Sequence, residues 1–139
     1  MGNPYSVFGT DKSLEAEKGV KLEYDGFSIN IHRAGGGNRN YQRVLANKMR
    51  PHRRKVEQGA LGEEVSRRLL AEVYAEAVVT GWDGVTDRDG KALEFTAENC
   101  VTLLLDLPDL FDDIINSASD VRNFRAVELE IEEKNSAKS

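Results

Sequence analysis

The sequence predicts an α+β domain, mainly α-helical, with four to five helices and one N-terminal antiparallel β-hairpin. Three observations predict this class. Apolar and polar residues alternate in two short runs on either side of an Asp-Gly pair. In the longer segments that follow, apolar residues recur every three to four positions, as on one face of a helix, and glycine or proline separates these segments. A chain of 139 residues is long enough for one modest core. We expect an N-terminal arm at 1–10, the domain at 11–131 and a flexible tail at 132–139.

The hairpin is predicted over residues 20–31. Apolar and polar residues alternate on both sides of Asp25-Gly26. An Asp-Gly pair in this position favours a type I′ turn, in which both central residues have positive φ. The apolar face of the hairpin must be covered by other elements, because an isolated hairpin is only marginally stable.

The remaining chain is expected to be helical. Asn38 and Thr96 precede helical patterns and are predicted N-caps, and Gly81 is predicted to end the helix that starts at Glu63. Pro51 either kinks the first helix or starts a new segment, because proline is tolerated in the first turn of a helix. The predicted helices span residues 39–50, 63–81, 97–107 and 108–133.

Composition and motifs argue against catalysis, cofactors and membrane insertion. The longest apolar run, VTLLL at 101–105, is far too short to span a bilayer, so no membrane partner is expected. Cys100 lies in a helical apolar pattern and is expected to be a core thiol, because neither His32 nor His52 forms a motif with it. No zinc spacing or nucleophile signature is present, so we expect neither an enzyme nor a bound cofactor.

The stretch GWDGVTDRDG, residues 81–90, raises the question of a calcium loop. With Gly90 at position 6 of an EF-hand, Asp87 and Asp89 would fill positions 3 and 5. Positions 1 and 12 would be Val85 and Thr96, however, and neither can supply the acidic ligand that the pattern requires.

We therefore interpret this stretch as an ordered loop without a metal. Asp83-Gly84 and Asp89-Gly90 are turn dipeptides, in which aspartate side chains bond to nearby main-chain groups. Trp82 and Phe95, together with Val85 and Leu93, are expected to anchor the loop in the core. A calcium-modulated interaction module remains an alternative to be tested by calcium titration.

Charge is divided unevenly along the chain. Residues 1–70 hold 13 Lys/Arg and 8 Asp/Glu, whereas residues 71–139 hold 6 and 16. Between residues 39 and 55 there are seven basic residues and no acid, namely Arg39, Arg43, Lys48, Arg50, Arg53, Arg54 and Lys55. This basic stripe could contact nucleic acid phosphates, or it could meet an acidic surface on a second copy or on another protein.

Several segments together resemble the tail assembly chaperones of long, non-contractile-tailed bacteriophages and their prophages. The most specific is G-W-x-G-V-T-D-x-D-G at 81–90, followed by F-T-x-E-N at 95–99 and L-P-D-L-F at 107–111. NPYSVFGTDKSLEAEKGVKLEY, FSINIHRAGGGNRNY and RPHRRKVEQG also fit. The resemblance covers roughly residues 3–127 and marks Trp82, Asp83, Gly84, Asp87, Asp89, Gly90, Phe95 and Thr96 as a structural signature.

The resemblance implies a non-catalytic protein of helical or α+β fold. Such chaperones coat the tape measure protein and keep it soluble until tail tube subunits polymerise around it. The implied partners are the tape measure protein, the major tail tube protein, further copies in a ring or spiral, and a frameshift-extended form of the chain. The implied place of action is the cytoplasm of the infected bacterial host, and the protein is expected to be absent from the mature virion.

Two further expectations concern sites. Codons GAA-AAA-AAC for Glu133-Lys134-Asn135 would create a slippery frameshift sequence, which the gene sequence can confirm. Arg43, Arg50, Arg53 and Arg54 are the candidate contacts with a second copy, so reversing Arg53 and Arg54 to Glu should shrink oligomers at low salt. The alternative function is that of a nucleic-acid-binding phage accessory protein using residues 39–55.

Overall fold

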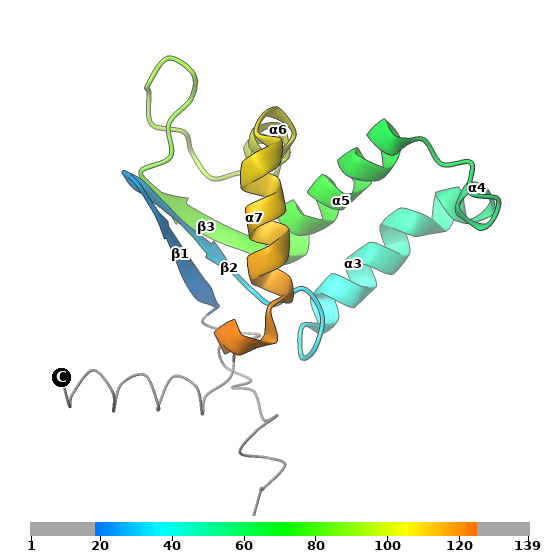
Figure 1. The fold of residues 1–139 in the computed structure, drawn as a ribbon. Helices are drawn as coiled ribbons and strands as arrows, with labels where there is room; N and C mark the ends of the chain where they lie inside the picture. Colours follow the sequence, from blue (N-terminus) through cyan, green and yellow to red (C-terminus); the bar gives the residue numbers. More distant parts are fainter. Residues whose placement is uncertain (1–18, 125–139) are drawn as a thin grey trace, which may run out of the picture.

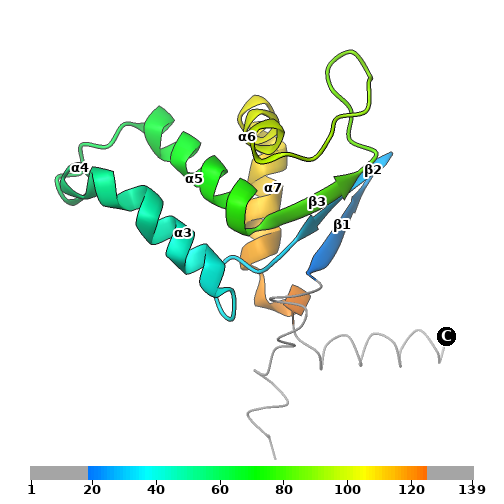
Figure 2. The ribbon, with the colours of Figure 1, turned by 180° about the vertical axis from the view of Figure 1, so that it is seen from behind.

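Three antiparallel strands form a small sheet in the order β1-β2-β3 (Figures 1 and 2). The strands are β1 (Val20–Tyr24), β2 (Phe27–Ile31) and β3 (Val79–Asp83). The predicted hairpin is confirmed, since Val20 lies opposite Ile31 and Tyr24 lies opposite Phe27. The computed structural model describes residues 19–124, so the expected arm at 1–10, the tail at 132–139 and residues 125–131 lie outside the described part.

The turn that joins β1 to β2 differs from the prediction. Gly26 has a φ of 87°, whereas Asp25 does not have a positive φ. A type I′ turn requires positive φ at both central residues, so the prediction of that turn type is wrong. Positive φ at the second central residue alone is the pattern of a type II turn, which glycine adopts at no steric cost.

The strand β3 corrects the predicted extent of the longest helix. This helix, α5, spans Glu63–Ala77 and does not continue to Gly81, which lies within β3 opposite Asn30. The β-branched residues after Ala77 fit a helix stripe and a strand equally well in the sequence. Pairing with the free edge of β2 stabilises the strand conformation of these residues. Because β2 lies far away in the sequence, the local residue pattern does not indicate this pairing.

The remaining elements follow the predicted order. Pro51 starts a new segment and does not merely kink the first helix, because a 3₁₀ turn and a short helix follow α3. The elements are α3 (Arg39–Met49), a 3₁₀ turn (Arg50–His52), α4 (Arg53–Glu57), α5, α6 (Ala97–Asp106), α7 (Pro108–Ser119) and a 3₁₀ turn (Val121–Phe124). The mainly helical α+β class is confirmed.

Two groups of helices surround the sheet. In Figures 1 and 2, α6 and α7 lie on one side of the sheet, while α3 and α5 run antiparallel to each other and extend away from it. The short helix α4 lies at the far end of this extension, where the chain turns back into α5. The helical extension therefore offers surface that the sheet does not cover.

The main core lies between the sheet, α5, α6 and α7. It includes Ile29 and Ile31 from β2, Leu104 from α6 and Phe111 from α7, each 1% exposed or less. Cys100 is buried among them, which confirms its prediction as a core thiol. A smaller cluster of Val44, Val73 and Ala77 holds α3 against α5.

The last helix is shorter than predicted. It was expected over 108–133, but α7 ends at Ser119 and Asp120 adopts an extended conformation. The Asp120 carboxylate accepts a hydrogen bond from the main-chain N–H of Arg122 at 3.0 Å. This local bond offers the backbone an alternative to the helix and starts the 3₁₀ turn that follows.

Candidate functional site

The basic arm comprises α3, the following 3₁₀ turn and α4, residues 39–57, and projects away from the sheet (Figure 1). The predicted contact residues Arg43, Arg50, Arg53 and Arg54 are all exposed on this arm. Arg43 and Arg50 are seven residues apart, a spacing that keeps them near one face of a helix. The structure thus brings the four predicted arginines onto one projecting element.

Within residues 19–124, the side chains of Arg43, Arg50 and Arg53 contact other residues of the arm itself. Arg43 donates to the Asn40 side chain at 2.6 Å, and Arg53 lies 3.5 Å from the Glu57 carboxylate one helical turn away. Arg54 makes no ion pair with any residue of the described range 19–124. Exposed contacts of this kind are weak, so the arm keeps most of its positive charge available for a partner.

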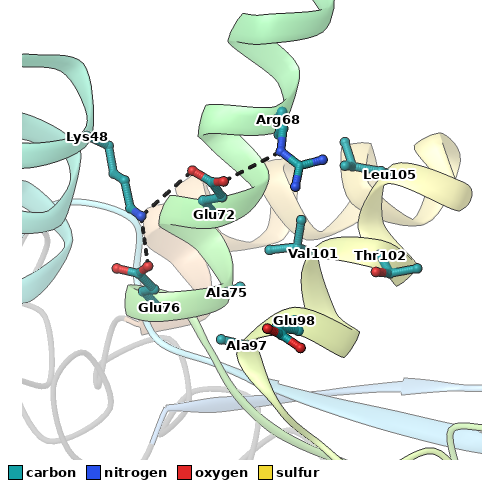
Figure 3. A pocket seen from close by; sticks show the side chains of 10 residues that line it. All are labelled: Lys48, Arg68, Glu72, Ala75, Glu76, Ala97, Glu98, Val101, Thr102 and Leu105. Carbon is teal, nitrogen blue, oxygen red and sulfur yellow. Dashed lines mark ion pairs between the residues drawn. The ribbon is translucent and has the colours of Figure 1, made fainter. Parts of the chain in front are cut away.

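Lys48 differs from the rest of the basic stripe. Its Nζ atom lies 3.0 Å from a Glu76 carboxylate oxygen and 3.7 Å from a Glu72 oxygen, both on α5 (Figure 3). The hydrogen bond to Glu76 raises the pKa of Lys48 above its ordinary value, and the nearby charges of both glutamates act in the same direction. Lys48 therefore joins α3 to α5 and is not free for a partner.

The arm also carries apolar surface. Val56 of α4 is 44% exposed, an unusual degree for a large apolar side chain in this structure. It lines a hollow with Ala46 and Met49, and Arg50, Arg53 and Glu57 border the same hollow. The tip of the arm therefore combines an apolar centre with a border of net positive charge.

An open groove runs between α5 and α6, and we call it the α5–α6 groove (Figure 3). Its apolar lining comes from Ala75, Ala97, Val101 and Leu105. Its charged lining comes from Lys48, Arg68, Glu72, Glu76 and Glu98. Figure 3 shows these charged groups along the sides, with ion pairs joining Lys48, Glu72 and Arg68.

The groove continues toward the start of α5. A second hollow shares Arg68 and Leu105 with it and extends to Glu63 and Pro108. From Glu63 to Glu76 the combined groove follows nearly the whole of α5, about 20 Å at 1.5 Å per helical residue. The apolar part of this lining is short, because Val101 and Leu105 lie one helical turn apart and the start of α5 adds mainly charged residues. A groove with an apolar floor and charged sides can accept an amphipathic helix.

The loop 84–92 is ordered by the turn chemistry that the sequence predicts. The Asp87 carboxylate accepts hydrogen bonds from the main-chain N–H groups of Asp89 at 2.9 Å and Lys91 at 3.0 Å. Gly84 and Gly90 have φ values of 75° and 81°. The chain turns at Asp87–Gly90, where the Gly90 N–H donates to the Asp87 carbonyl at 3.1 Å, and it bends at Gly84. Among residues 19–124, no three His, Cys, Asp or Glu side chains cluster closely enough to hold a metal.

The predicted apolar anchors hold this loop to the core. Val85 is buried, and the half-buried Trp82 ring meets the Phe95 ring edge-to-face at 4.9 Å. The Trp82 indole donates a hydrogen bond to the Leu93 carbonyl at 2.8 Å.

Thr96 caps α6, as predicted, because its side-chain oxygen accepts a hydrogen bond from the Asn99 N–H at 3.0 Å. Asp83, exposed at the end of β3, completes the signature.

A second cleft separates this loop from α6, and we call it the acidic cleft. Its apolar residues are Leu93, Leu103 and Leu107, of which Leu107 is 47% exposed. Its charged residues are Asp87, Asp89, Asp106 and Arg88, and Arg88 lies 3.5 Å from the Asp106 carboxylate. The cleft therefore has a net negative border around an apolar floor.

Burial raises the pKa of three groups in the described part of the chain, Tyr24, Tyr74 and Cys100. Burial raises the pKa of the Cys100 thiol to about 12 and that of Tyr74 to about 12. Burial and a hydrogen bond to Asp113 raise the pKa of Tyr24 well above its ordinary value. In the described part of the chain, no helix has both the length and the apolar character to cross a membrane.

The sequence alone did not identify the α5–α6 groove or the acidic cleft. Both are formed by segments that meet only after folding. The acidic excess of residues 71–139 was a usable signal for the cleft, because three of its aspartates belong to that half. For the groove, the small residues Ala75 and Ala97 gave no indication, since alanine is common on both buried and exposed helix faces.

One comparison with known proteins gives a match, over more than half of the chain. A family model described as YdaY prophage protein matches residues 36–135, a range that includes the basic arm, the α5–α6 groove and the acidic cleft. No curated protein sequence and no solved structure matches the chain.

Proposed function

The chain belongs to the YdaY prophage protein family, and from this premise we propose that it is a tail assembly chaperone. In this role it binds the tape measure protein of the prophage, keeps it soluble and promotes assembly of the tail tube around it. It acts in the cytoplasm of the bacterial host, without catalysis, and it is absent from the mature virion. Tail tube protein and a frameshift-extended form of the chain are its further proposed partners.

The observation that carries this proposal is the α5–α6 groove. A tape measure protein is a long helical chain with extensive apolar surface, and such a chain aggregates unless that surface is covered. The groove presents the exposed Ala97 and the half-buried Val101 and Leu105 to a partner, with charged side chains on its borders. A single groove of this kind binds weakly, but many copies along one helix would bind with high avidity.

Co-expression with the tape measure protein in bacteria tests the proposal. We expect the tape measure protein to be insoluble alone and soluble with the wild-type chain, and the two to copurify. Ala97→Trp should lower the soluble fraction several-fold, because Ala97 is an exposed groove residue that a large ring would block. The matched control Asn116→Trp places the same ring on an exposed position of α7 outside the groove.

The outcomes separate the function from its site. A tape measure protein that stays insoluble with the wild-type chain contradicts the proposed function. Equal solubilisation by wild type, Ala97→Trp and Asn116→Trp keeps the function but contradicts the groove as the binding site. Circular dichroism spectra and unfolding temperatures of the three proteins establish that any difference does not come from misfolding.

A second candidate function is nucleic acid binding through the basic arm. The observation that favours it is the exposure of Arg43, Arg50, Arg53 and Arg54 on one projecting element. Phosphate contacts would make the affinity for labelled DNA fall steeply with salt concentration. Anisotropy titrations of wild type and Arg53→Glu/Arg54→Glu in increasing salt test this function, which fails if the wild type shows no salt-sensitive binding.

A further inference from the structure

We propose that copies of this protein join head to tail, with the basic arm of one copy seated in the acidic cleft of the next. This pairing would place many copies along one tape measure protein, and in that respect it rests on the proposed function. The evidence for the pairing itself does not depend on that function, because it comes from the shape and charge of two surfaces on this chain.

The two surfaces have opposite charge. At the tip of the arm, Arg50, Arg53 and Arg54 are exposed, and Glu57 is the acidic residue beside them. At the cleft, Asp87, Asp89 and Asp106 outnumber the single arginine, Arg88. Opposite potentials steer two surfaces together and set their register, so each surface favours the other over a copy of itself.

The two surfaces also match in their apolar parts. Val56 at the arm and Leu107 at the cleft are two of the three large apolar side chains that are markedly exposed in residues 19–124. Val56 lies inside the cationic border, and Leu107 lies beside the half-buried Leu93 and Leu103 inside the acidic border. Contact between them would bury both apolar centres and shield the surrounding ion pairs from water, which strengthens those pairs.

The arm cannot fill the cleft of its own chain. In Figures 1 and 2 the tip of the arm with α4 and the loop 84–92 lie on opposite sides of α6. The partner that carries the complementary arm is therefore a second copy. Because arm and cleft are different surfaces, the contact is heterologous, and its repetition produces a ring if the rotation closes or an open helix if it does not.

Charge reversal on each surface, followed by mixing, tests this pairing. The arm-reversed variant is Arg53→Glu/Arg54→Glu, and the cleft-reversed variant is Asp89→Arg/Asp106→Arg. Asp87 is left unchanged, because its carboxylate holds the loop through two main-chain N–H groups. Nuclease-treated, purified proteins are measured by sedimentation velocity at low salt, alone and as an equimolar mixture.

We expect the wild type to form oligomers and each variant alone to be monomeric, since like charges then face each other. The mixture should recover oligomers of wild-type size, because the acidic arm of one variant fits the basic cleft of the other and the remaining two surfaces are native. High salt should dissociate both the wild type and the mixture.

Several results would overturn the pairing. These are a monomeric wild type, variants that remain oligomeric alone, a mixture that stays monomeric, and wild-type oligomers that disappear after nuclease treatment. If circular dichroism shows that a double variant is unfolded, Arg54→Glu and Asp89→Arg are used singly, because both side chains are exposed. The proposed chaperone activity has a separate readout, the solubility of the tape measure protein, so either idea can fail without the other.

Discussion

The side-chain amide of Asn38 donates a 2.8 Å hydrogen bond to the main-chain carbonyl oxygen of Ala77, the last residue of α5. The same nitrogen reaches the Arg33 carbonyl at 2.9 Å, and the side-chain oxygen accepts from the Tyr41 N–H at 3.1 Å. Asn38 is only 4% exposed. One buried side chain therefore caps the start of α3 and holds it against the end of α5, where the basic arm leaves the sheet.

Replacing Asn38 should loosen the base of the arm. Asn38→Ala removes the N-cap bond, which contributes about 1 kcal/mol, and leaves the buried Ala77 carbonyl without this donor, which costs about 1–3 kcal/mol. We expect the free energy of unfolding to fall by roughly 2–4 kcal/mol in urea titrations. Asn40→Ala, at an exposed neighbouring position, should change it by less than about 0.5 kcal/mol. Equal effects of the two substitutions would contradict this role of Asn38.

The two roles of Asn38 show which features a sequence can predict. Its capping bond to Tyr41 spans three residues, so the local pattern predicted it. Its bond to Ala77 spans 39 residues and depends on how α3 packs against α5, so no local pattern could. The hairpin and the cap at Thr96 belong to the first kind. The strand β3 belongs to the second kind, because its conformation is decided by pairing with β2.

Gly84 and Gly90 should differ in their tolerance of a side chain. Both have positive φ, so alanine is strained at either position, at a cost of about 1–2 kcal/mol. A Cβ at Gly84 would also lie 2.7 Å from the Gly26 carbonyl oxygen, a backbone atom that cannot move aside, whereas at Gly90 nothing lies within 4 Å. Gly84→Ala should therefore lower the unfolding temperature clearly more than Gly90→Ala does. Equal shifts in thermal denaturation would contradict the close contact between the two turns.

Lys48 should stabilise the junction of α3 and α5 in a pH-dependent way. Its pKa is raised, chiefly by the hydrogen bond to Glu76, so the charged form is favoured in the folded protein. The stabilisation is fully present below the ordinary pKa of 10.5 and is lost as pH rises through the higher folded value. Lys48→Met should lower the free energy of unfolding by about 0.5–1 kcal/mol at pH 7, as for a partly exposed pair.

Two controls sharpen this test. Lys55→Met removes an exposed charge of the arm and should have almost no effect on unfolding. The difference between wild type and Lys48→Met should shrink in high salt and above pH 10.5. A difference that is independent of both salt and pH would contradict a stabilising role of the Lys48 charge.

As with the fold, the parts of the functional surfaces that are local in sequence were predictable, and the parts that depend on tertiary packing were not. The basic stripe was predictable, because seven cations without an acid stand together in the sequence, and the structure exposes most of them. Lys48 was the exception, since its partners Glu72 and Glu76 lie on another helix. The acidic cleft joins residues from a loop to residues from α6, and the α5–α6 groove joins two helices, so both needed the tertiary structure.

Cys100 should behave as a protected core thiol. Its side chain is 1% exposed, and burial raises its pKa from 9.0 to about 12, so the folded state disfavours the thiolate. The corresponding contribution to stability is complete below pH 9 and is lost as pH rises toward 12, because only the unfolded chain then gains from ionisation. Between pH 8 and 10 we expect the free energy of unfolding of the wild type to fall by about 1 kcal/mol more than that of Cys100→Ala. Urea titrations at both pH values measure this difference.

Labelling of Cys100 with a thiol reagent at pH 8 should be slow until urea unfolds the protein. Rapid labelling of the native protein would show that α6 opens readily, and it would contradict the burial of Cys100 in the main core.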